Sequence, residues 1–92
     1  MPKQFLHVSF QFVDGQSRRD KLEPIFNKAL DWFRYTPTSW ILWTSRSAEH
    51  WYERVRPLLS DDDTVFIVKL DISERQGWVS KRFWDWLNQD RS

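Results

Sequence analysis

The sequence predicts an α+β fold, in which an antiparallel sheet carries two helices on one face and a further helix follows at the C-terminus. Segments in which apolar residues alternate with polar ones, typical of strands, are separated by segments with helical periodicity. The chain has 92 residues, which is enough for one hydrophobic core and too few for a second. We therefore expect residues 1–92 to form a single domain.

The segment Phe5–Val13 is expected to be the central strand. Alternate residues from Leu6 onward are apolar, and most of the residues between them are polar. Asp14-Gly15 then supplies typical turn residues. We expect helices to pack on the apolar face of this strand and the more polar face to stay open.

A first helix is expected over about residues 20–30, with Asp20 as its N-cap. Pro24 would then occupy the fourth helical position, where a missing backbone N–H costs only the first hydrogen bond of the helix. The apolar residues recur at helical spacing and are Leu22, Ile25, Phe26, Ala29 and Leu30.

The next segment is expected to be a β-hairpin. Residues 32–36 alternate in character, Pro37-Thr38 is typical of a turn, and Ser39–Ser45 is rich in aromatic and β-branched residues. The alternative is that the first helix continues to Tyr35, which would leave one strand here.

A second helix should begin at an N-cap, Ser47, and Pro57 should produce a kink or a 3₁₀ ending. The segment Thr64–Ile72 is expected to be a strand buried on both faces, because it is almost continuously apolar.

A final helix is expected at about residues 79–88, with Ser80 as its N-cap. Within it Phe83, Trp84 and Leu87 should share one side, whereas Trp86 should face elsewhere. The full order of elements is strand, helix, strand, strand, helix, strand and C-terminal helix. This order is typical of a ferredoxin-like βαββαβ sandwich with both central helices on one face.

Several segments together have the pattern of a known group of small proteins. They are the first strand with its glycine-containing loop, Ser39-Trp40-Ile41-Leu42, the helix from Ser47, Asp63–Val68 and Trp78 with Phe83–Leu87. These segments resemble the SinR-like small proteins, which are similar to the second CRISPR-associated (Cas) protein family and to VapD-type toxins. The resemblance extends over roughly Phe5 to Leu87, and it implies a ferredoxin-like fold that forms homodimers. Better-known members of these families bind duplex nucleic acid or cleave RNA or DNA with a metal ion.

The chain departs from this resemblance at the metal site. The nuclease members have an aspartate near the end of the first strand, and Gln11 occupies that position here. A neutral amide is a poor ligand for Mg²⁺, which is bound mainly through carboxylates and waters. Asp14 is the candidate catalytic residue and metal ligand if the register is shifted, but an aspartate before glycine is also common in turns for conformational reasons.

Basic residues are the candidates for contacts with nucleic acid. If they gather around one groove they would bind phosphates, although exposed basic residues often form only a solvated surface. The formal net charge is +1, so such a partner would require a local basic patch. The candidates are Arg18, Arg19, Lys21, Arg54 and Arg56.

The aromatic content predicts an interface. Seven tryptophans and seven phenylalanines exceed what a small core needs, and tryptophan is enriched where proteins associate. A homodimer is therefore expected, unless the C-terminal helix folds back over the sheet and covers these rings. The candidate interface residues are Trp40, Trp43, Trp78 and Trp86.

We expect a non-catalytic homodimer that binds a macromolecular partner, with nucleic acid as one candidate and no cofactor. One alternative is a Mg²⁺-dependent endonuclease of RNA or DNA with Asp14 at the dimer axis. Another is a regulatory module that binds a protein through its aromatic surface. The chain has no cysteine and no apolar run of signal or membrane-spanning length, which predicts a cytoplasmic location and no membrane partner.

Overall fold

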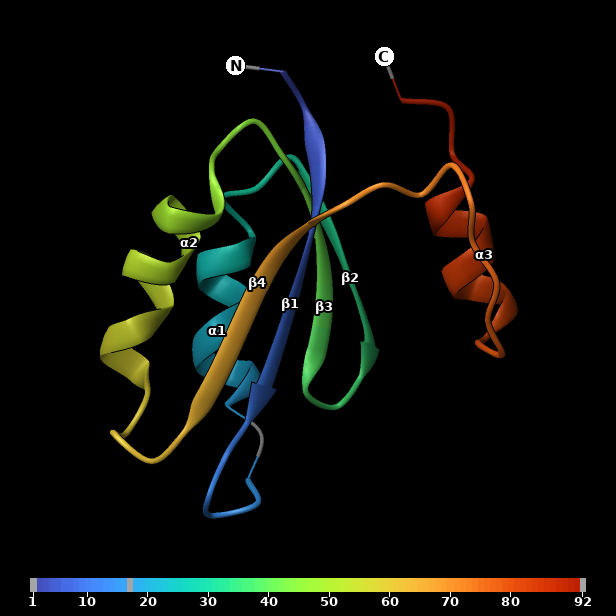
Figure 1. The fold of residues 1–92 in the computed structure, drawn as a ribbon. Coiled ribbons are helices and arrows are strands. Elements are labelled where there is room, and N and C mark those ends of the chain that lie inside the picture. Colours follow the sequence, from blue (N-terminus) through green and yellow to red (C-terminus); the bar gives the residue numbers. More distant parts are fainter. Residues whose placement is uncertain (1, 17, 92) are drawn as a thin grey trace.

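The computed structural model describes residues 2–16 and 18–91, which form one four-stranded antiparallel sheet and three α-helices (Figure 1). The predicted α+β class is thereby confirmed. In chain order the elements are β1 (Gln4–Gln11), α1 (Arg19–Phe26), β2 (Asp31–Thr36), β3 (Ser39–Thr44), α2 (Ala48–Val55), the 3₁₀ turn η1 (Arg56–Leu58), β4 (Thr64–Leu70) and α3 (Lys81–Leu87).

The strands are ordered β2-β3-β1-β4, and each neighbouring pair is antiparallel. β1 is a central strand, as predicted. Its Leu6 lies opposite Leu42 of β3 on one side and opposite Lys69 of β4 on the other. β2 and β4 are therefore the two edges of the sheet.

α1 and α2 cover one face of the sheet, and α3 lies on the other face (Figure 1). The alternate apolar residues of β1 point toward α1 and α2, so the main core forms between these layers, as the period of two predicted. Its buried members are Leu6, Val8, Phe10, Phe12, Leu22, Phe26, Trp40, Leu42, Trp51 and Val55.

The face expected to be polar and open is closed over part of its area by α3. A second apolar cluster lies between α3 and the sheet. It forms because β2 and β3 carry apolar side chains on this face, beside the polar residues of β1. No pattern in β1 alone could show this. The buried members of the cluster are Phe5, Ile41, Phe83, Trp86 and Leu87.

The predicted N-caps of α2 and α3 are confirmed. The Ser47 hydroxyl accepts a hydrogen bond from the His50 amide, and the Ser80 hydroxyl accepts one from the Phe83 amide, each at 3.2 Å. These are N-cap interactions. Pro57 lies in η1, as expected for a helix that ends in a 3₁₀ turn.

The first helix differs from its prediction. It begins at Arg19, so Asp20 lies in its first turn and Pro24 is its sixth residue. It ends at Phe26, because the chain then turns and the Leu30 amide donates a hydrogen bond to the Trp43 carbonyl at 2.9 Å. The expected hairpin is confirmed, and the alternative of a helix continuing to Tyr35 is wrong.

The last strand also differs. β4 ends at Leu70 and is an edge strand, so the predicted burial on both faces is wrong. Phe66 is 62% exposed, and Val68 is also exposed. No helix among the residues that the structure describes has the length and apolar character needed to cross a membrane.

Candidate functional site

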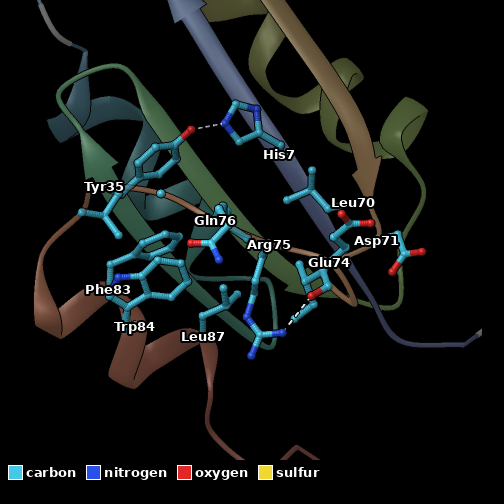
Figure 2. Close-up of a pocket in the computed structure, with 14 residues that line it drawn as sticks. His7, Tyr35, Leu70, Asp71, Glu74, Arg75, Gln76, Phe83, Trp84 and Leu87 are labelled. Atoms are coloured by element: carbon cyan, nitrogen blue, oxygen red, sulfur yellow. Dashed lines mark hydrogen bonds between the residues drawn. The ribbon is translucent and has the colours of Figure 1, made fainter.

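A cleft of about 480 Å³ lies between α3 and the sheet (Figure 2). His7 of β1, Ile41 of β3 and Leu70 of β4 contribute its sheet side. Its helix side consists of Phe83, Trp84 and Leu87. The chain between β4 and α3 forms the rim, with Asp71, Ile72, Glu74, Arg75, Gln76, Gly77 and Val79.

A polar pair lies within these aromatic walls. His7 Nε2 and the Tyr35 hydroxyl form a hydrogen bond, which joins β1 to β2 inside the cleft (Figure 2). Burial lowers the pKa of His7, because a low-dielectric environment disfavours the charged imidazolium. The Tyr35 ring stacks on Phe83 with their centroids 5.2 Å apart. The cleft thus offers flat apolar surfaces beside the hydrogen-bonded His7–Tyr35 pair. This arrangement is suited to binding an aromatic side chain or ring.

The rim is held in place by hydrogen bonds. The Arg75 guanidinium donates to the Ile72 carbonyl at 2.8 Å and to Asn88 Oδ1 at 2.6 Å, which connects the rim to the end of α3. The Asp71 carboxylate accepts from the Ser73 amide at 2.9 Å, and this bond lowers the pKa of Asp71. These bonds connect the rim to α3 and to its own backbone.

Two of the four tryptophans predicted at an interface are buried within the chain. Trp40 is completely buried in the main core. Trp86, which was expected to face away from its neighbours, is only 7% exposed. Its indole N–H donates to Asp31 Oδ2 at 2.9 Å, and the Arg91 guanidinium lies 4.5 Å from its ring centroid. Asp31 lies in a strand far from α3 in the sequence, so the helical pattern could not show this partner. The pattern therefore predicted the wrong side of the helix for Trp86.

The other two predicted interface residues differ in exposure. Trp43 is half-buried and packs on Phe5, with the ring centroids 4.7 Å apart. Trp78 is fully exposed, although Gly77 and Val79 on either side of it line the cleft.

The predicted metal ligand, Asp14, has partners within its own turn. Its carboxylate accepts a hydrogen bond from the Gln16 amide at 3.0 Å and one from Arg18 Nη2 at 3.1 Å. Gly15 adopts a φ of 70°, which favours glycine. The described residues contain no group of three or more His, Cys, Asp or Glu side chains placed to hold a metal ion. These contacts account for Asp14 as a turn residue.

A carboxylate that the sequence did not single out, Asp63, organises the same end of the sheet. It accepts hydrogen bonds from the amides of Val13 and Ser60, both at 2.9 Å, and lies 3.4 Å from Arg18 Nη2. The two amides lower the pKa of Asp63, since they stabilise its charged form.

The predicted basic residues do not form one free basic groove. Arg18 lies between Asp14 and Asp63, and Arg56 pairs with Asp61 at 2.8 Å. Arg19 lies 3.8 Å from Glu23, and Lys21 is exposed on α1. Arg54 instead lines a hollow together with three basic side chains that the sequence did not indicate, namely Lys28, Arg46 and His50.

Comparison with known proteins found no family model that matches this chain, no match among curated proteins and no match among solved structures.

Proposed function

We propose that this chain is a non-catalytic, homodimeric ferredoxin-fold protein of the Cas/VapD-like kind, and that it acts by binding a macromolecule, here a second copy of itself. Counted from the other edge, the strand order is β4-β1-β3-β2. β3 lies between the two strands that α1 connects, and β1 lies between the two that α2 connects. This split arrangement supports the ferredoxin-like assignment.

The observation that carries the proposal is the position of Trp78. Its ring is fully exposed while the residues beside it line an aromatic cleft. A tryptophan can bury about 150–250 Å², and leaving it in water forgoes that hydrophobic stabilisation. Tryptophan is also among the residues that contribute most to protein–protein binding energy. Trp78 is therefore the natural anchor of an interface.

A second copy of the chain is the occupant that fits the cleft. In a two-fold dimer each Trp78 would enter the partner's cleft, so both contacts would form at once. Lys81 and Arg82 follow Trp78, and Asp71 and Glu74 lie at the rim of the cleft. The exchange would bring these opposite charges together across the interface, which favours this pairing of surfaces.

The exposed apolar surface extends from the cleft along β4. Val68 lies opposite His7, which lines the cleft, and Phe66 lies opposite Ser9 on the same face. Two exchanged indoles and the surfaces they cover would bury roughly 600–1,000 Å², about half or more of the 1,200–2,000 Å² typical of a stable interface. Phe66 and Val68 would supply much of the remainder.

The proposal is tested by measuring molecular mass with light scattering after size exclusion, over a range of concentrations. The chain should elute at twice its own mass, and Trp78→Ser should shift it to the monomer. Leu30→Ser is the matched control, because Leu30 is also an exposed apolar residue but lies after α1. A monomeric parent protein would overturn the proposal, as would a Trp78→Ser variant that remains dimeric.

A further inference from the structure

A second hollow, of about 410 Å³, lies beside the end of α1 and the first two turns of α2. Its polar lining is entirely basic. Lys28 follows α1, Arg46 precedes α2, and His50 and Arg54 lie one turn apart on α2. Ile25 and Trp51 supply its apolar wall. An adjoining hollow shares Arg46 and His50 and adds Ser45 and Ser47.

Three permanent positive charges line this hollow. Among the residues that the structure describes, Lys28, Arg46 and Arg54 form no ion pair, and no carboxylate lines the hollow. Arg18 and Arg56, by contrast, are each held by aspartates. The basic charge of the hollow is therefore available to a ligand.

The arginine and histidine backbones are held in position from the core. Thr44 Oγ1 accepts hydrogen bonds from the Arg46 amide at 3.0 Å and from the Trp51 indole at 3.2 Å. The Arg46 carbonyl accepts from Gln4 Nε2 at 3.0 Å. The first turn of α2 is fixed by its Ser47 cap. Because the backbone is held, a ligand would have to order mainly the side chains of these residues on binding.

The charges also act on one another. Partial burial and the nearby Arg54 and Arg46 lower the pKa of His50, and Glu53 opposes the effect only weakly. A positive charge disfavours protonation of a neighbouring imidazole, because like charges repel one another. A bound anion would relieve this repulsion.

We infer that this hollow binds a terminal phosphate group, which is a dianion near neutral pH. Arginine guanidinium groups match phosphate oxygens with paired hydrogen bonds, and a lysine adds a point charge. The hollow is larger than a phosphate ion, and half-buried Ile25 in its wall can contact the organic group that carries the phosphate. A nucleoside 5′-monophosphate and the 5′-phosphorylated end of a nucleic-acid strand share this chemistry.

Titration calorimetry at low salt tests the inference with four probes. These are inorganic phosphate, a nucleoside 5′-monophosphate, and one single-stranded oligonucleotide prepared with and without its 5′-phosphate. The monophosphate should bind, and Arg46→Gln and Arg54→Gln should each weaken it about tenfold, as expected for the loss of one charge-assisted hydrogen bond. Lys69→Gln is the control, since Lys69 is an exposed basic residue on β4 that does not line the hollow.

The oligonucleotide pair identifies the source of the phosphate. Tight binding of the 5′-phosphorylated strand alone assigns the site to strand ends, whereas preference for the monophosphate assigns it to a free nucleotide. Failure of every phosphate probe to bind would overturn the inference. Tight and equal binding of the two oligonucleotides, or equal weakening by Lys69→Gln, would also overturn it, because either result indicates general attraction to a basic surface.

A spectroscopic measurement separates this site from the dimer. Bound phosphate should raise the pKa of His50 in an NMR titration, because a nearby negative charge favours the imidazolium. The same result is expected in Trp78→Ser, since the hollow lies on the face of the sheet opposite the cleft. The phosphate site and the homodimer can therefore fail independently.

Discussion

Replacing Thr44 with valine should destabilise the fold through two lost hydrogen bonds. Thr44 is 1% exposed, and its hydroxyl accepts bonds from the Trp51 indole and the Arg46 amide. Trp51 is also 1% exposed, so its N–H would remain buried without a partner, at a cost of about 1–3 kcal/mol. The Arg46 bond, which is nearer the surface, adds about 0.5–1.5 kcal/mol.

The total is about 1.5–4.5 kcal/mol, which corresponds to a fall in Tm of roughly 6–36 °C for a domain of this size. Urea unfolding followed by far-UV circular dichroism, at one fixed protein concentration, measures the change in free energy of unfolding. Thr44→Ser is the control, because it keeps the hydroxyl and loses only a methyl group, at a cost of about 1 kcal/mol. Equal stability of Thr44→Val and the parent protein would refute the reasoning, as would a serine variant less stable than the valine variant.

Three further outcomes are expected. Two backbone hydrogen bonds lower the pKa of Asp63. The Asp63 carboxylate therefore stabilises the fold at pH values above its ordinary pKa of 3.8, and this stabilisation is lost as the pH falls through the lower pKa of the folded state. Asp63→Asn should therefore show a weaker pH dependence in urea unfolding below about pH 4. Ser80→Ala should cost about 0.5–2 kcal/mol and Ser80→Gly only a few tenths, as denaturant midpoints would show. Burial lowers the pKa of His7, so the unfolded chain takes up a proton at this residue before the folded chain does. The free energy of unfolding should therefore fall as the pH drops below about 6.5, and His7→Gln should remove this part of the pH dependence.

The features that the sequence predicted correctly are local ones. The caps at Ser47 and Ser80 and the 3₁₀ turn at Pro57 depend on residues within one turn of each other. The period of two in β1 is likewise contained in the strand. Such signals can be recognised without knowing what packs against them.

The features that were missed depend on distant partners. Trp86 turns inward because Asp31, 55 positions earlier, accepts its indole N–H. Phe66 is exposed because β4 became an edge strand, and the apolar content of a strand does not show its place in the sheet.

The two candidate sites are equally nonlocal. Each of the four strands contributes one residue to the cleft, and α3 and the chain before it contribute the rest. In the basic hollow, Lys28 and Arg46 lie on opposite sides of the β2–β3 hairpin in the sequence. The basic residues that the sequence did indicate were chosen for closeness along the chain, and most of them proved to have acidic neighbours in space.

The central position of β1 has a consequence for how the chain folds. β1 is the first strand to be made, yet one of its two neighbours is β4, and Phe5 pairs with Leu70. Such long-range pairing slows folding, because a large loop must close before the contact contributes stability. During synthesis the β2–β3 hairpin can form from adjacent residues, but the sheet cannot be completed until β4 has left the ribosome. Until then one edge of β1 stays unpaired, and this is the period in which the chain is most exposed to aggregation.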